Sequence, residues 1–153
     1  MRAYFAALML LVILGTAPVA GQEKRTVAVA DPELAKQLGA DERGMRKYVL
    51  VILKTGPNRV PEGPERNEMF KGHFANIERL AEARKLVAAG PFGDKTDWRG
   101  MFIFAVDTQE EAAAFVATDP VIKKGEMVAE YHTLYSSAAL MAVNDIHAKI
   151  APK

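Results

Sequence analysis

Apolar residues along the chain gather in four short runs that alternate with longer, helically patterned segments. Two of these runs, Tyr48–Leu53 and Met101–Val106, are apolar at every position rather than at alternate positions. Such a pattern is typical of a strand that is covered on both faces. Leu86–Gly90, continuing weakly through Gly93, and Met127–Tyr135 are the two further predicted strands.

Segments with helical spacing follow the first, third and fourth of these strands. Glu65 to Arg84 predicts a helix, and its apolar stripe consists of Phe70, Phe74, Ile77, Leu80 and Ala81. Thr108 and Glu111 form a capping box that opens a second helix, which ends before Asp119-Pro120. A last helix begins at Ser136 or Ser137, with a stripe made of Leu140, Val143, His147 and Ile150.

The resulting order is strand, helix, strand, strand, helix, strand, which predicts an α+β fold of the ferredoxin-like, or split βαβ, type with an antiparallel sheet. Helices cover only one face of such a sheet, whereas two of its strands are apolar on both faces. A second copy of the same sheet would cover the other face, so we expect a face-to-face homodimer.

The first 46 residues precede this domain. Residues 1–21 carry Arg2, an uncharged run of 11 residues from Tyr4 to Leu14 and then small residues, which predicts an export signal cleaved near Ala20 or Gly21. An uncleaved anchor is the alternative. Residues 22–46 form a leader with a short helix, capped by Asp31 and ended by Gly39. The main domain covers residues 47–137, followed by a C-terminal helix and tail over 138–153. We expect a periplasmic or secreted protein with no membrane attachment after cleavage.

Composition and charge narrow the function classes. The 153 residues carry 20 Lys and Arg against 19 Asp and Glu, without a basic stripe, so a nucleic-acid partner is not expected. The absence of cysteine excludes disulfides, thiolate zinc sites and a cysteine nucleophile. No dinucleotide, P-loop or α/β-hydrolase motif occurs, and the three histidines lack metal-ligand spacing, so neither a cofactor nor a metal is expected.

Two residues are candidates for chemistry. His73 shares a predicted helix face with Phe70, Ile77 and Leu80, so it is sheltered and needs a hydrogen-bond partner. From the residues alone, a buried structural histidine is the simpler explanation of that position. Asp119, which stands directly before a proline, is explained completely as a helix N-cap. The same carboxylate can also accept a hydrogen bond from an imidazole and fix its tautomer.

Four segments in this order and spacing resemble the YCII-related (YciI-like) family of the dimeric α+β barrel superfamily. They are Tyr48–Leu53, Gly72–Leu80 (GHFANIERL), Leu86–Phe92 and Thr118–Pro120, which together span about 90 residues between Lys47 and Ala139. The stretch from Leu38 to Asn58 looks like an exported subgroup of that family. The resemblance implies a dimeric barrel fold.

The same resemblance implies an enzyme site built on one histidine and one aspartate, which are His73 and Asp119 in this sequence. Most members of the family have no established activity. A few relatives are associated with dehydrochlorination of chlorinated hydroxyquinols, and the wider superfamily holds monooxygenases, lactone isomerases and haem enzymes. Fold alone therefore does not decide the reaction.

Further residues are candidates for a substrate pocket. Pro91 and Phe92 follow Gly90 at a strand end, where the backbone allows close approach and the ring can form a wall. Trp98 and Arg99 in the hairpin turn would rim a site, although a surface or dimer contact explains them too. His132 is a second site histidine or, alternatively, the partner of Glu130 on one strand face.

Three hypotheses follow for the function. The first is a small cofactor-free enzyme in which His73 and Asp119 perform acid/base chemistry, by elimination or isomerisation, on a small aromatic or carbonyl substrate. The second is a module that binds a small molecule in the same cleft without breaking a bond. The third is a structural dimer. An open cleft lined by the two residues would favour the first two.

Overall fold

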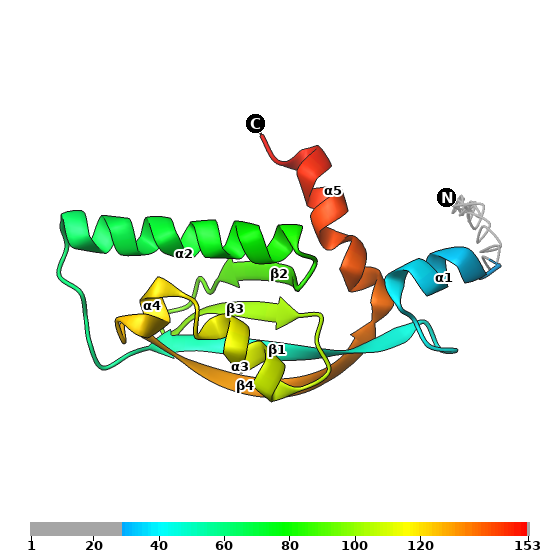
Figure 1. Cartoon of the computed structure of the whole chain (residues 1–153), viewed down its shortest axis with the longest axis horizontal. Helices are drawn as coiled ribbons and strands as arrows, with labels where there is room; N and C mark the ends of the chain where they lie inside the picture. The colour runs from blue at the N-terminus through cyan, green and yellow to red at the C-terminus, as the bar shows by residue number, and fades with distance from the viewer. Residues whose placement is uncertain (1–28, 153) are drawn as a thin grey trace, which may run out of the picture.

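The structure is a computed structural model that describes residues 29–152. The predicted signal peptide, residues 1–21, and the leader up to residue 28 lie outside the described residues. The elements, in chain order, are α1 (Pro32–Leu38), β1 (Met45–Thr55), α2 (Pro64–Glu82), β2 (Leu86–Pro91), β3 (Trp98–Phe104), α3 (Gln109–Val116), α4 (Pro120–Lys123), β4 (Met127–Ser137), the 3₁₀ helix η1 (Ala138–Ala142) and α5 (Val143–Ile150) (Figure 1).

The four strands form one antiparallel sheet in the order β2-β3-β1-β4. In the centre of the sheet, Val51 of β1 lies opposite Phe102 of β3 on one side and Tyr131 of β4 on the other. Together with the helices between β1 and β2 and between β3 and β4, this order is the split βαβ arrangement. The predicted α+β, ferredoxin-like fold is therefore confirmed.

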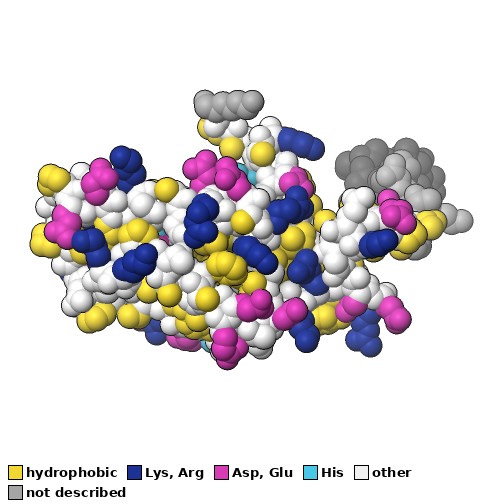
Figure 2. All heavy atoms as spheres, viewed as in Figure 1, with side chains coloured by type: hydrophobic (Ala, Val, Ile, Leu, Met, Phe, Trp, Pro, Cys, Tyr) yellow, Lys and Arg dark blue, Asp and Glu magenta, His cyan; other side chains and the backbone are white. Residues whose placement is uncertain are grey.

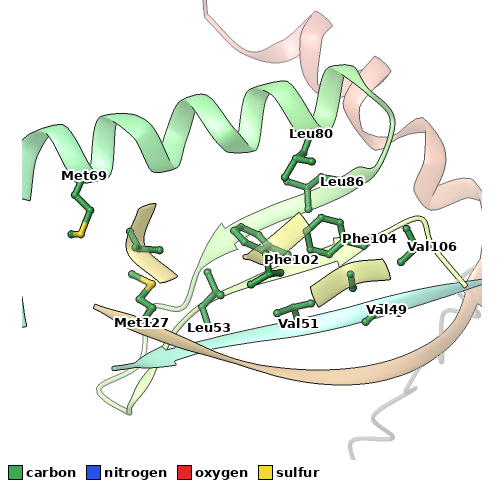
Figure 3. Close-up of a cluster of buried hydrophobic side chains, with 13 residues drawn as sticks. Val49, Val51, Leu53, Met69, Leu80, Leu86, Phe102, Phe104, Val106 and Met127 are labelled. Atoms are coloured by element: carbon green, nitrogen blue, oxygen red, sulfur yellow. The ribbon is translucent and has the colours of Figure 1, made fainter. Parts of the chain in front are cut away.

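The core lies on the side of the sheet where α2, α3 and α4 pack. Every second residue of the two central strands points there, and Figure 3 shows these side chains directed at Leu80 of α2 and at Leu86. Met69 and Met127 close one end of this cluster. The inward-facing strand residues are Val49, Val51, Leu53, Phe102 and Phe104.

The opposite face of the sheet carries no helix among the described residues. Leu50, Ile103 and Leu134 lie on that face and are only partly buried, whereas Tyr48 and Ile52 on the same face are buried. The all-apolar pattern of Met101–Val106 therefore corresponds to one buried and one half-buried face in the single chain. An apolar face of this kind remains available for a partner.

The buried face of α2 is rotated relative to the predicted stripe. Its four buried residues are Met69, His73, Asn76 and Leu80, whereas Phe74, which we expected in the stripe, is 63% exposed. The prediction placed His73 inward beside the apolar stripe but did not include Asn76. Two polar residues occupy interior positions, because the segment before α4 supplies hydrogen-bond partners for them, as described below.

The two ends of the described chain differ in how well they were predicted. Asp31 caps α1 and Gly39 ends it in the left-handed conformation, as expected. Ser137 caps the last helical segment as predicted, but its first turn is the 3₁₀ helix η1. The predicted apolar stripe of the last helix packs only at its start: Leu140 and Val143 are partly buried, whereas His147 and Ile150 are exposed.

The described surface mixes charges of both signs. Lys and Arg side chains alternate with Asp and Glu over the face that Figure 2 shows, with hydrophobic side chains between them. Among residues 29–152, every helix is too short or too polar to span a bilayer.

Candidate active site

A close approach between two helices brings the two predicted site residues together. A Cβ atom added at Gly72 of α2 would lie 2.9 Å from Cγ of Pro120 in α4, so glycine allows this contact without a shift of either helix. His73 follows directly, and its Nδ1 lies 2.8 Å from Oδ2 of Asp119. The sequence reasoning named both residues, and the structure places them in hydrogen-bond contact.

Asp119 is fully buried and its two oxygens have different partners. Oδ1 accepts a hydrogen bond from the backbone N–H of Val121 at 3.1 Å, which makes Asp119 the N-cap of α4 as predicted. Oδ2 accepts from Nδ1 of His73. One carboxylate therefore caps a helix and holds an imidazole at the same time.

A second group of polar side chains supports this pair. The amide nitrogen of Asn76 lies 3.5 Å from Oδ2 of Asp119. The amide oxygen of Asn76 accepts from Arg79 at 2.7 Å and from the hydroxyl of Thr118 at 3.0 Å. These contacts hold the chain on both sides of Asp119 against α2. Sequence analysis missed Asn76, although its spacing of three residues from His73 puts both on one helix face.

The contact with Asp119 engages one ring nitrogen of His73, Nδ1, and leaves Nε2 for other partners. If the carboxylate of Asp119 accepts this hydrogen bond, Nδ1 of a neutral ring carries the proton and Nε2 presents a lone pair. Within residues 29–152, Nε2 makes no hydrogen bond, and it is not sealed from solvent. His73 thus combines a fixed tautomer with one free basic nitrogen.

This histidine lines a cavity of about 370 Å³ between α2 and the sheet, a volume typical of small-molecule sites. Its walls are mostly apolar and come from α2, β1, β2, β3 and the start of β4. The lining residues include Phe70, Phe74, Ile77, Ala89, Met101, Phe102 and Met127. Pro91, which we predicted as a substrate-binding residue, also lines this cavity.

Phe92 and Trp98 do not line the cavity but pack on each other nearby. Their ring centroids lie 5.3 Å apart, and Trp98 is 43% exposed. This aromatic pair belongs to the hairpin between β2 and β3, because Phe92 donates its backbone N–H to the carbonyl oxygen of Arg99. Phe92 directly follows Pro91 in the chain, so the pair lies next to the cavity of His73 without forming its wall.

His132 lies on the opposite face of the sheet from His73. Side chains alternate along β4, so Tyr131 packs against the core and His132 points away from it. Its Nε2 lies 2.9 Å from a carboxylate oxygen of Glu130, the strand-face contact named as the alternative. Within one chain, therefore, His132 does not line the cavity of His73, and its role in substrate binding stays a prediction.

A larger hollow of about 720 Å³ lies between α2, β2 and α5. His147 and Asp145 line it, whereas neither His73 nor Asp119 does. In the described part of the chain, no group of three or more His, Cys, Asp or Glu residues is arranged to hold a metal ion.

Glu126, which sequence analysis did not single out, is a second fully buried carboxylate close to the cavity. Its oxygens accept from the backbone N–H of Val60 at 2.7 Å and from Arg66 at 2.8 Å, and Arg59 lies 3.1 Å away. Burial alone would raise the pKa of Glu126, but these donors and positive charges outweigh it and hold the pKa below 4.5. Glu126 is therefore ionised where it is buried.

Comparisons with known proteins found one matching family model and one curated relative. The family model of the YCII-related domain matches residues 47–134, more than half of the chain. The uncharacterized protein YjpA of Bacillus subtilis (strain 168) is 34% identical over 58 residues, which are 38% of this chain and 66% of YjpA. The aligned part is thus just under two thirds of that relative's length.

One solved structure is also similar: 5-chloro-2-hydroxyhydroquinone dehydrochlorinase (TftG) from Burkholderia phenoliruptrix AC1100, in complex with 2,5-dihydroxybenzoquinone. It shares 26% sequence identity with this chain. The likeness covers 58% of this chain and 90% of that one, with a TM-score of 0.39.

The depressed pKa of Glu126 makes stability depend on pH. Glu126→Gln should lower the free energy of unfolding by about 2 kcal/mol at pH 7, because charged hydrogen bonds are lost. A group with a lowered folded-state pKa stabilises above its unfolded pKa, near 4.5, and ceases to do so as the pH falls through the folded value. The difference between wild type and variant should therefore shrink below about pH 4.5.

Urea denaturation of both proteins between pH 3 and pH 7 measures this difference. Glu65→Gln is the control, since Glu65 is an exposed carboxylate that contacts Lys124 at the surface, and it should leave the midpoint almost unchanged. A Glu126→Gln protein as stable as wild type at pH 7 would contradict the account of this cluster.

Proposed function

The chain belongs to the YCII-related family, and we propose that it is an enzyme in which His73 and Asp119 act as an acid/base pair on a small substrate. The observation that carries this proposal is the division of roles between the two ring nitrogens. Nδ1 lies 2.8 Å from a buried carboxylate, Nε2 has no hydrogen-bond partner within residues 29–152, and the residue lines a cavity. A histidine that served packing alone would not need to border an open cavity.

The chemistry available to this pair is proton transfer. Nε2 of His73 takes a proton from a substrate carbon next to a carbonyl group or on an oxidised ring, and Asp119 stabilises the imidazolium that results. In an isomerisation, the same nitrogen returns the proton to a different atom. In an elimination, the electron pair of the broken C–H bond forms a double bond, and the leaving group departs with its own bonding pair.

The walls of the cavity support a flat, apolar substrate. Phe70, Phe74 and Phe102 all line it, and the ring of Phe102 stacks on that of His73 with centroids 6.0 Å apart. Apolar walls also lower the local dielectric constant, which strengthens the interaction between imidazolium and carboxylate. A small aromatic or quinone-like carbonyl compound therefore suits the cavity better than a sugar or a peptide.

Non-catalytic binding in the same cavity is the second candidate function. The mostly apolar lining would hold a small molecule without any reaction, and only turnover separates this function from the first. Screening the purified protein against phenolic and lactone substrates, with His73→Ala as the inactive reference, distinguishes the two.

Asp119→Asn gives a sharper test of the acid/base pair. Asparagine keeps a side-chain oxygen for the N–H of Val121, so the thermal midpoint should stay close to wild type. Its amide nitrogen would instead donate to Nδ1 of His73 and move the ring proton to Nε2, which removes the base. Activity should fall by about 100-fold or more.

Asp119→Ala should lose both roles, with about 1 kcal/mol of stability lost with the cap alone. His147→Ala removes an exposed histidine of α5 and is the control for activity. If Asp119→Asn kept full activity in an assay that His73→Ala abolishes, Asp119 would be only a helix cap.

The uncovered sheet face also supports the expected homodimer. Leu50, Ile103 and Leu134 are partly exposed there, and a second sheet would bury them in an interface well above ~1,000 Å². Light scattering at micromolar concentration should return twice the mass of one chain.

Leu50→Glu should give a folded monomer, because a carboxylate would be buried without a partner. Ile146→Glu, on the exposed side of α5, should stay dimeric; a monomeric wild type would refute the dimer.

A further inference from the structure

Arg99 brings a second charged side chain to the cavity of His73. Among the described residues that line this cavity, Arg99 and His73 alone have ionisable side chains. We propose that the natural ligand is a small, flat molecule with an anionic oxygen group, either a carboxylate or an ionised phenol, and that Arg99 binds this group. The inference rests on the proposed function, because it names the substrate class of the same site.

A β-bulge directs Arg99 toward the cavity. Leu53 of β1 lies opposite Gly100, but the next residue, Lys54, lies opposite Trp98, so Arg99 has no partner residue in β1. Such an extra residue changes the direction in which a side chain points, and bulges are frequent next to active sites. The guanidinium of Arg99 reaches to 3.8 Å from Glu126, whose other partners include Arg66 of α2. It therefore lies on the same side of the sheet as α2.

The charges around Glu126 leave Arg99 free for a ligand. Arg66 and Arg59 contact the same carboxylate oxygen at 2.8 and 3.1 Å, whereas Arg99 stays beyond hydrogen-bond distance. Three arginines around one carboxylate give an excess of two positive charges. Within residues 29–152, the guanidinium of Arg99 makes no hydrogen bond, and its side chain is 26% exposed.

An anion is the ligand that this arrangement favours. The ion pair of Arg99 with Glu126, at 3.8 Å, leaves the hydrogen-bond donors of the guanidinium open, and its planar fork matches the two oxygens of a carboxylate. A neutral ligand would displace water from the guanidinium and leave its donors unpaired, and a cationic ligand would be repelled. The aromatic walls favour a flat body. An anionic aromatic compound satisfies both parts of the site.

Benzoate and benzamide are suitable probes, because they have the same ring and nearly the same shape but differ in charge. Calorimetry on the full-length protein should show benzoate binding about tenfold more tightly than benzamide, the difference expected of one charge-assisted hydrogen bond. 4-Nitrophenol, measured above and below the pH at which it ionises, tests the phenolate in the same way. A preference for either anion supports the proposal and identifies which oxygen group the site takes.

Variants at two arginines locate the source of this preference. Arg99→Gln should abolish the preference for benzoate, and Arg99→Lys should retain part of it, since lysine keeps the charge without the fork. Arg59→Gln is the matched control. It removes another positive charge that contacts Glu126, but Arg59 does not line the cavity. The control should keep the preference.

Two outcomes would overturn the proposal: wild type that binds each anion no more tightly than its neutral counterpart, or an Arg99→Gln protein that keeps the preference. His73→Ala separates this result from the proposed function. It should abolish turnover but still prefer benzoate. Anion preference without any His73-dependent turnover would refute the acid/base function alone, whereas His73-dependent turnover without anion preference would refute the role of Arg99 alone.

Discussion

Two carboxylates removed from water, Asp119 and Glu126, stand at the two ends of one short segment between α3 and β4. A buried carboxylate is tolerated only where hydrogen bonds and positive charges replace its hydration. Helix α2 supplies partners for both, with His73 at one end of the segment and Arg66 at the other. The segment and the helix are therefore held together by charge as well as by packing.

This constraint also forms the site. The hydrogen bond that satisfies Asp119 fixes the tautomer of His73, and the cluster that satisfies Glu126 places an arginine at the same cavity. The base, His73, and the positive group, Arg99, are therefore held by carboxylates at the two ends of one segment, and both side chains line the cavity between α2 and the sheet. The stability of the fold and the proposed chemistry depend on the same contacts. A substitution at Asp119 therefore tests the acid/base role only if it preserves the helix cap of α4.

The sequence predicted the order of helices and strands along the chain, the caps at Asp31 and Asp119, and the histidine and aspartate as candidate residues, because local periodicity and capping chemistry determine those features. Arg99 was named as a rim residue, but the arginine cluster was missed, since Arg99 and Glu126 lie far from Arg59 and Arg66 in sequence and meet them only in the fold. The exposure of Phe74 was missed for a similar reason. Hydrophobic spacing favoured that ring for the core, but the partners of His73 and Asn76 determine the orientation of α2.

The tautomer of His73 is the central claim, because the proposed base exists only if Nδ1 carries the proton. Long-range ¹H–¹⁵N correlation spectra of histidine-labelled protein measure it directly, with the His73 signals assigned by their loss in His73→Ala. At a pH where the ring is neutral, the account predicts a protonated, pyrrole-like Nδ1 and an unprotonated, pyridine-like Nε2. A pyridine-like Nδ1 with the proton on Nε2 would contradict it.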